Sequence, residues 1–499
     1  MNGAGLAALW WVVLLPLRPY VPPVLEPDPP FAPAEVTTVE IVPPDADWDI
    51  PALARPRDTA PLFGSIARGT RVRVRGELAV PSSRYCGGSV FYAIEPFGWI
   101  CGEFTQPTDQ PLTRTSALAL EPGTPVPYRY VMVVVPEGEL LPMWSSPEAL
   151  RAYAEPERQL SRGDTVALAP LGSQTRSSLT FEDQRYHLTV DGKVLPTQST
   201  FQLTNYSAWQ GVALSATDRL PFAWVTPRSA KVYDQPRGTA LEQLDRRTRV
   251  DVLEEVLDGK VRWIRIGDGR WMRADQLNEV RKLVRPEGTG VNERWIDLDL
   301  GEQVVVAYVR DQPVFATLTS SGRPPNRTPR GNYPVWGRAS AVTMKSQDYD
   351  DKPYYVNRVP WVVFFQAHNA LHAAYWHDRF GTVKSHGCAN LSPSDARYLF
   401  EWLEPRMPAG WTGLRNWDLT PAPVVHVRDS SRSKPFVQER NIGPPDKEDE
   451  AKRMEQAIAR RAAQAAAEAQ LAAQAGAIVP AATLPGALVP PAAPPAQAP

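Results

Sequence analysis

Apolar and polar residues alternate with a period of two over many short stretches between residues 55 and 428, and this pattern predicts a mainly β protein. Residues 296–300, Ile-Asp-Leu-Asp-Leu, alternate as expected of a strand with one buried face. Residues 304–309 and 314–318 predict two further strands. Residues 424–427 predict the strand that closes this unit.

Two stretches, 55–108 and 223–280, share a layout of short strands and turn residues. The first runs from a strand at residues 70–74 to the aromatic segment Phe-Gly-Trp-Ile-Cys at 97–101. The second ends on Gly-Arg-Trp-Met at 269–272. This order resembles that of bacterial SH3-like barrels, so we expect two small SH3-like modules.

The rest of the chain has a different composition. Residues 1–17 contain an apolar run shorter than the roughly 20 residues of a spanning helix, and predict a signal peptide or a membrane anchor. Residues 18–52 are rich in Pro and acidic residues and predict a linker. Residues 110–222 predict a β-rich region of unknown role. Residues 446–476 predict a solvated Ala-rich helix, and 477–499 a disordered Ala/Pro tail.

Composition narrows the class of protein. The chain has 499 residues, enough for two to four domains, and 43% of them are hydrophobic, which allows a sizeable core. The 52 prolines are about twice the usual share. The net charge is −1, so bulk charge gives no reason to expect binding to nucleic acid or to an anionic membrane.

Three cysteines occur, and their spacing separates them into a pair and a single residue. Cys86 and Cys101 enclose a short loop in the first module, and in an oxidising compartment they are expected to form a disulfide. The alternative is that both are reduced packing residues. Cys388 stands alone, and an odd thiol in an exported protein is a candidate reactive group.

Four of the six histidines lie between positions 368 and 386, directly before Cys388. Two chemistries fit this cluster: a cysteine nucleophile with a histidine base, or a zinc site. Zinc sites usually show paired short spacings such as Cys-x-x-Cys, which are missing from the sequence, so we expect no metal. Histidines that are only packed in the core are the remaining alternative, and they are the favoured interpretation for His368 and His426.

The segment Ser385-His386-Gly387-Cys388 suits nucleophilic catalysis. A thiol with an ordinary pKa of about 8.5 is mostly protonated at neutral pH and needs a nearby base. Gly387 leaves room for an incoming carbonyl and permits unusual backbone angles. The N–H groups of Gly387 and Cys388 are then candidate donors to the oxyanion that forms.

Residues 292–428 resemble the L,D-transpeptidase catalytic domain, also called the YkuD domain. The resemblance rests on His372, a gap of twelve residues, and the segment Ser-His-Gly-Cys-Ala-Asn at 385–390. Residues 328–333, Thr-Pro-Arg-Gly-Asn-Tyr, are similar to an upstream Thr-Pro-x-Gly segment of the family. The implied fold is a multi-domain, mainly β protein whose β-rich catalytic domain carries short helices and follows the SH3-like modules.

The resemblance also implies roles for single residues. Cys388 would be the nucleophile and His372 the proton donor and acceptor, with His386 as the less favoured base. Ser385, His386 and Asn390 would shape the loop around the nucleophile. The predicted substrate-binding residues are Tyr375, Trp376, His377, Asn390 and Arg397. For the two aromatic residues, packing in the core is nearly as good an interpretation.

The implied activity is acyl transfer from a peptidoglycan stem peptide through a cysteine thioester to an amine, with no cofactor. The alternatives are an L,D-carboxypeptidase, in which water is the acceptor, and a non-catalytic cell-wall-binding scaffold. We expect export to the periplasm or cell envelope and anchoring to the wall through the SH3-like modules. Nucleic acid is not an expected partner, and a membrane is expected only through an N-terminal anchor.

Overall fold

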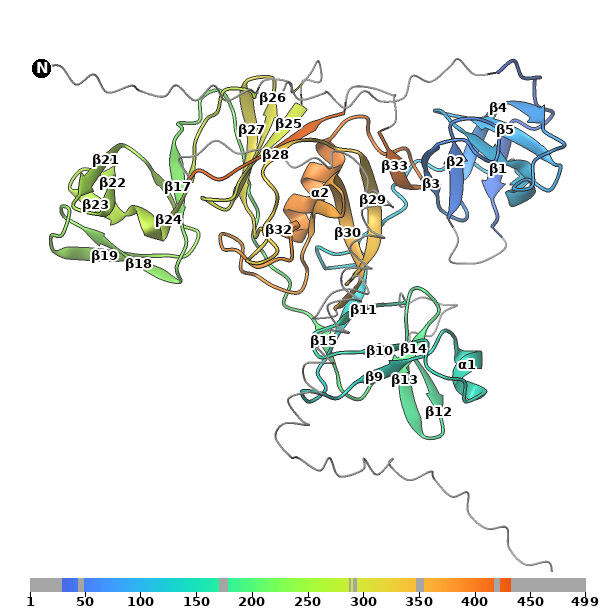
Figure 1. Ribbon diagram of the computed structural model, residues 1–499, viewed down its shortest axis with the longest axis horizontal. Coiled ribbons are helices and arrows are strands. Elements are labelled where there is room, and N and C mark those ends of the chain that lie inside the picture. Colours follow the sequence, from blue (N-terminus) through green and yellow to red (C-terminus); the bar gives the residue numbers. More distant parts are fainter. Residues whose placement is uncertain are drawn as a thin grey trace, which may run out of the picture. The chain divides into compact units, whose positions relative to one another are not determined.

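The computed structural model describes residues 29–43, 49–169, 178–286, 289, 294–346, 354–416 and 422–431. The predicted signal or anchor at 1–17, the helix at 446–476 and the tail at 477–499 lie outside the described residues. Neither α-helix within these ranges has the length and hydropathy that a membrane crossing requires. As predicted, strands dominate the structure (Figure 1).

The first module is a set of short antiparallel strands around a core that contains Trp99, Phe91 and Ile41, all fully buried. Cys86 and Cys101 are joined by a disulfide beside Trp99 and Phe91. The likeness to SH3-like barrels stays a prediction. The elements are β1 (Thr38–Ile41), β2 (Ile50–Leu53), β3 (Leu62–Ile66), β4 (Arg71–Ala79), β5 (Val90–Ile94), β6 (Trp99–Cys101), η1 (Gly102–Phe104) and β7 (Thr105–Pro107). The linker predicted for residues 18–52 is wrong at β1 and β2, because these strands pair with β4 and β3 and belong to the module.

The middle region, 110–222, contributes strands to two larger sheets that extend into the last unit, and it also forms two small sheets and one short helix. The helix starts at Pro147, after Ser146, whose hydroxyl accepts a hydrogen bond from the Ala149 N–H. The elements are β8 (Arg129–Val133), β9 (Leu141–Met143), α1 (Pro147–Arg151), β10 (Arg158–Leu160), β11 (Thr165–Leu168), β12 (Ser178–Phe181), β13 (Gln184–Leu188), β14 (Val194–Pro196), β15 (Thr200–Leu203) and β16 (Val212–Ala213).

The second module, 223–280, has a core of small and branched side chains that includes Ala223, Val232, Ile264 and Met272. Its outer strands are strongly charged and carry several arginine–carboxylate pairs. The elements are β17 (Phe222–Val225), β18 (Ser229–Tyr233), β19 (Ala240–Asp245), β20 (Arg249–Asp251), β21 (Glu254–Asp258), β22 (Val261–Gly267), β23 (Arg270–Arg273), η2 (Ala274–Gln276) and β24 (Leu277–Val280).

The last unit has two sheets, and α2 packs against β30 and β31 (Figure 1). One sheet has the order β16-β27-β26-β25-β34-β28. In the other, β29 pairs with β30, β30 with β31, and β31 with β32. The elements are β25 (Arg294–Asp299), β26 (Val304–Val309), β27 (Gln312–Leu318), β28 (Gly331–Pro334), β29 (Gly337–Lys345), β30 (Tyr355–Gln366), β31 (Asn369–Ala373), β32 (Ala389–Leu391), α2 (Pro393–Trp402), β33 (Trp411–Arg415) and β34 (Val424–Arg428).

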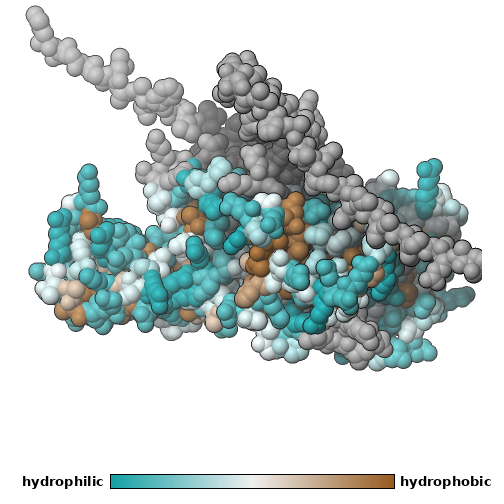
Figure 2. All heavy atoms as spheres, turned by 90° about the horizontal axis from the view of Figure 1, so that it is seen from below, coloured by the Kyte–Doolittle hydropathy of each residue, from teal (hydrophilic) through white to brown (hydrophobic). Residues whose placement is uncertain are grey.

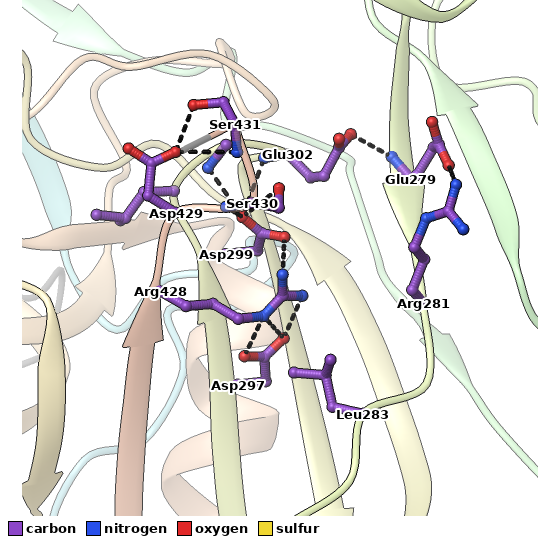
Figure 3. A network of polar contacts seen from close by, with 12 residues as sticks. Glu279, Arg281, Leu283, Asp297, Asp299, Glu302, Arg428, Asp429, Ser430 and Ser431 are labelled. Carbon is purple, nitrogen blue, oxygen red and sulfur yellow. Dashed lines mark hydrogen bonds and ion pairs between the residues drawn. The ribbon is translucent and has the colours of Figure 1, made fainter. Parts of the chain in front are cut away.

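Strand β25 is not half-buried as its alternation predicts, because both faces of its sheet are covered. Asp297 and Asp299 are 0% and 1% exposed. Arg428, from the parallel neighbour β34, donates two bonds to Asp297, at 2.9 Å each, and lies 2.6 Å from the Asp299 carboxylate (Figure 3). Burial raises the pKa of Asp297 to about 6, although Arg428 acts in the opposite direction. The two aspartates thus stay inside because one guanidinium satisfies both.

Strand pairing crosses the domain boundaries that composition suggests. Val212 of β16 pairs with Ala316 of β27, which attaches the middle region to the last unit. Gly64 of β3 pairs with Leu414 of β33, which attaches the first module as well. These segments therefore share backbone hydrogen bonds rather than only side-chain contacts.

The face shown in Figure 2 is largely hydrophilic, with hydrophobic residues gathered in a few groups. Many large aromatic side chains of the described residues are inside, including Trp99, Trp224, Trp295 and Trp411, which are at most 1% exposed. Burial of these rings is a main source of the apolar contribution to folding.

We expect the disulfide to stabilise the first module. Its cysteines are 15 residues apart, and closing a loop of that length in the unfolded chain is worth about 3 kcal/mol. Replacing both Cys86 and Cys101 with Ala should lower the unfolding free energy of this module by that order in urea titrations. The matched control is the wild-type protein under reducing conditions, which should lose the same amount. An unchanged unfolding midpoint in both would contradict the expectation.

Candidate active site

Two short parallel strands bring the candidate base and nucleophile together. His372 lies in β31, and Cys388 immediately precedes β32. In the register of this pair Leu371 faces Ala389 and His372 faces Asn390. One residue earlier in this register, Cys388 lies opposite Ala370. Ala370 and His372 are two residues apart, which is about 6.6 Å along a strand.

Side-chain alternation places both groups on one face of this pair. Leu371 and Ala389 point into the core beneath α2. The opposite face carries Ala370 and Cys388, which pack in one cluster with Trp376. His372, two residues after Ala370, shares that second face and stacks on Trp376 with ring centroids 5.9 Å apart. The thiol and the imidazole thus lie on the same face of the strand pair, the one away from α2.

His372 is set up as a proton acceptor. It is 2% exposed, and its Nδ1 lies 3.1 Å from the carbonyl oxygen of Ala373. A carbonyl can only accept, so Nδ1 carries the proton and Nε2 is left with its lone pair. Burial lowers the pKa of His372 to about 4, so the ring is neutral at physiological pH.

Cys388 is half-buried, and its sulfur lies against the turn that precedes β31. The sulfur is 3.8 Å from the carbonyl oxygen of His368. Burial raises the pKa of the thiol to about 11, and a hydrogen bond from the Ala370 backbone partly offsets this shift. Solvent still reaches part of the residue. The resting pair is therefore a neutral thiol beside a neutral imidazole.

The loop before Cys388 is closed by its own hydrogen bonds. The Ser385 hydroxyl donates to the carbonyl oxygen of Cys388 and accepts the N–H of Gly387 at 3.1 Å. Ser385 thus holds the Gly387 N–H in this structure, and the role of that N–H as an oxyanion donor stays a prediction. Thr328 donates to the Gly387 carbonyl at 2.7 Å and accepts the Gly322 N–H at 2.9 Å. The sequence did not single out Thr328 for this role, although the Thr-Pro-x-Gly resemblance contained it.

Gly387 is required by its backbone and by its surroundings. Its φ is +129°, in a region that residues with a side chain rarely adopt. A Cβ there would lie 2.4 Å from the Asn369 side-chain oxygen. The close approach of this loop to Asn369 thus depends on this glycine.

Asn390 and His377 form a side-chain contact next to the base. The His377 Nδ1 accepts the Arg379 N–H at 3.1 Å, and its Nε2 lies 2.9 Å from the Asn390 amide. Burial lowers the pKa of His377 to about 4, so the ring is neutral and its one proton is on Nε2. A proton on Nε2 requires an acceptor, so the Asn390 amide is oriented with its oxygen toward His377. In the opposite orientation this oxygen is buried without a hydrogen-bond partner.

Of the other predicted site residues, one contacts the candidate base and two contact residues elsewhere. Trp376 contacts His372, as above, and the exposed His386 ring instead stacks on Tyr354 with centroids 5.3 Å apart. Tyr375 is 2% exposed, stacks on Tyr130 and donates to the Asn357 carbonyl, so it is a core residue and cannot line a groove.

Arg397 is paired within its own helix, and its predicted substrate contact stays a prediction. It lies on α2 and forms an ion pair with Glu401, one turn later, at 2.8 Å. This pairing gives it a structural role in the helix. Among the described residues, no group of three or more His, Cys, Asp or Glu side chains is placed to hold a metal ion.

The geometry defines a β-rich domain with a cysteine and a neutral histidine on one face of a parallel strand pair. Residues 293–418 match the family model of the L,D-transpeptidase catalytic domain, YkuD. This part of the chain is therefore similar to the L,D-transpeptidase catalytic domain, in agreement with the resemblance. No curated protein matches the chain.

Solved L,D-transpeptidases are similar to part of the chain. The catalytic domain of the Enterococcus faecium enzyme is 24% identical, covering 28% of this chain and 98% of its own, with a TM-score of 0.22. A crystal structure of an E. faecium mutant is also 24% identical, covering 27% of this chain and 49% of its own, with a TM-score of 0.22. The chain thus spans about half of that relative. The Stackebrandtia nassauensis enzyme is 20% identical, covering 29% and 60%, with a TM-score of 0.21.

The raised thiol pKa predicts the pH profile of alkylation by iodoacetamide. Only the thiolate reacts, and its fraction falls about tenfold for each pH unit below the pKa. With a pKa of about 11, the alkylation rate of Cys388 should rise steadily from pH 7 to pH 10. Mass spectrometry of quenched samples measures the rate, with a free cysteine peptide as reference. A flat, fast rate between pH 6 and pH 8 would indicate a thiolate–imidazolium pair and contradict the prediction.

Replacing Gly387 with Ala should damage the site without unfolding the domain. The added methyl meets the Asn369 oxygen, and the φ of +129° becomes strained, at a cost of about 1–3 kcal/mol. We expect a large loss of acylation at Cys388 and a small drop in the melting temperature. The matched control is Gly269→Ala, a turn glycine with positive φ and open space around it. Equal acylation by both variants would show that the close approach at Gly387 is unimportant.

Proposed function

We propose that the chain is a peptidoglycan L,D-transpeptidase of the cell envelope that acts through a thioester on Cys388. The observation that carries the proposal is the pairing of β31 with β32, which puts the thiol and the Nε2-basic imidazole of His372 on one face. The family match of residues 293–418 supports the same chemistry.

The first step forms the thioester. The His372 Nε2 takes the thiol proton as the sulfur bonds to the carbonyl carbon between the third and fourth residues of a stem peptide. The N–H of Cys388 is the candidate donor to the oxyanion, because Ser385 holds the N–H of Gly387. The C–N bond then breaks, and the leaving D-amino acid takes the proton from Nε2.

The second step returns the enzyme to its starting state. An amine attacks the thioester carbonyl, and His372 accepts a proton from it. The C–S bond breaks, and the sulfur leaves as thiol with that proton. If water takes the place of the amine, the same site is an L,D-carboxypeptidase, so the acceptor decides the activity.

Neutral resting groups are compatible with this cycle. The base takes its proton during attack, so a thiolate need not accumulate beforehand. His372, with a pKa of about 4, stays unprotonated above that pH and is available as a base. The modules before the catalytic domain would hold the enzyme near the wall.

Purified stem peptides and muropeptides provide the test. Wild type should give a Cys388 acyl adduct and cross-linked or exchanged products by mass spectrometry, and Cys388→Ala should give neither. His372→Gln should lower the acylation rate by about 10²–10⁴-fold, as expected for loss of a general base. His386→Gln should cost far less, because that ring stacks on Tyr354.

The products distinguish the candidates. Cross-links or amine exchange identify a transpeptidase, and trimmed peptides alone identify a carboxypeptidase. Absence of any adduct on folded wild type would overturn the proposal in favour of a wall-binding scaffold. A loss at His386→Gln equal to that at His372→Gln would overturn the assignment of the base.

A further inference from the structure

The segment from 377 to 384, here the connecting loop, joins the strand of the base to the loop of the nucleophile. The second module, 223–280, holds it from outside. Arg246 donates to two carbonyl oxygens of the loop, those of Asp378 and Phe380, both at 2.9 Å. One guanidinium thus bridges two carbonyl groups that are two residues apart, a geometry that lysine cannot reproduce.

Arg247 adds a charged contact to the same loop. Its guanidinium lies 2.5 Å from the Asp378 carboxylate, which also accepts the Ser207 hydroxyl. Burial alone would raise the pKa of Asp378, but these hydrogen bonds leave it lowered. Arg247 has a φ of +71° and lies 5.1 Å over the ring of Trp209. A strained backbone and an aromatic platform therefore hold the side chain toward the loop.

The module makes a second contact further along the loop. The Asn278 side chain donates to the Gly381 carbonyl at 3.2 Å and accepts the Thr226 hydroxyl at 2.5 Å. Gly381 has a φ of +98°, and a Cβ there would be 2.9 Å from the Asn278 oxygen. Only glycine lets the loop lie this close to the module. Next to Asn278, the Glu279 N–H donates to the Glu302 carboxylate at 2.8 Å (Figure 3).

The inner side of the connecting loop contacts the catalytic strands. His377 bonds to Asn390, the register partner of His372. The carbonyl of Arg379 accepts the Ser320 hydroxyl at 2.8 Å, and Ser320 itself pairs with Asn390 through its backbone. The loop thus lies between the module on one side and the strand of the nucleophile on the other.

We propose that residues 223–280 position the catalytic pair, with Arg246, Arg247 and Asn278 clamping the connecting loop so that Asn390 and Cys388 keep their register with His372. Arg246 and Arg247 are positioning residues, since they act through the loop. The proposal rests on the proposed function for its kinetic readout. The match to the catalytic-domain family covers residues 293–418, so the clamp comes from outside it.

The test compares three variants of the full chain with wild type. Arg246→Ala/Arg247→Ala removes the clamp. Asp378→Asn removes the ion pair to Arg247 with little change of volume, and serves if the double variant does not fold. The matched control is Arg270→Ala, an exposed arginine of the same module that pairs with Glu242.

Two readouts are measured for each variant. The first is kcat and KM for a stem-peptide donor. The second is the rate and pH profile of iodoacetamide alkylation, which reads a single site because Cys86 and Cys101 are bonded to each other. A small misplacement of reacting groups can cost about 100-fold, so we expect kcat to fall about 10–100-fold in the double variant with a smaller change in KM. Its alkylation profile should also shift, and Arg270→Ala should match wild type.

The outcomes separate the two proposals. If wild type turns over no peptide, the proposed function fails, while a shifted alkylation profile in the clamp variants still supports the positioning role. If folded double and Asp378→Asn variants match wild type in kcat and alkylation, the positioning role is overturned. An equal loss in Arg270→Ala would also overturn it, because that arginine contacts Glu242 and not the loop.

Discussion

The hydrogen-bonded pairing of β31 with β32 is the constraint on which the candidate site depends. These strands are only five and three residues long, and they lie parallel, so the chain must leave one and return by a long connection before pairing. That connection is the segment 374–388. A slip of one residue would turn Cys388 to the face of the core beneath α2. The chemistry is therefore only as precise as this register.

Burial supplies the electrostatic character of the pair. Both groups are neutral at rest, because desolvation lowers the pKa of His372 and raises that of Cys388. The hydrogen bond from Nδ1 to the Ala373 carbonyl then decides which nitrogen is basic. The reactivity of Cys388 consequently depends on how the thiol and the imidazole are aligned with a substrate, and not on a thiolate present at rest. A shift of either strand would therefore change the rate of reaction.

The modules are structurally continuous with the catalytic region. Strand pairs join β3 to β33 and β16 to β27, and arginine contacts join the second module to the connecting loop. Buried ion pairs such as that of Arg428 with Asp297 and Asp299 fix neighbouring strands at their ends. Removing one partner from such a site leaves an unpaired buried charge, which costs more than the pair itself contributes.

The sequence by itself determined the β-rich class, the position of the catalytic region and the identity of the candidate nucleophile. These follow from local pattern and from a short motif around Cys388. The sequence left two alternatives for Cys86 and Cys101, a disulfide or two reduced cysteines. Only the tertiary structure decided that Asp297 is buried, that Ser385 holds the Gly387 N–H and that Tyr375 belongs to the core. Each of these depends on a partner distant in sequence, or on the direction of one backbone N–H, and alternation along a strand carries no information about either.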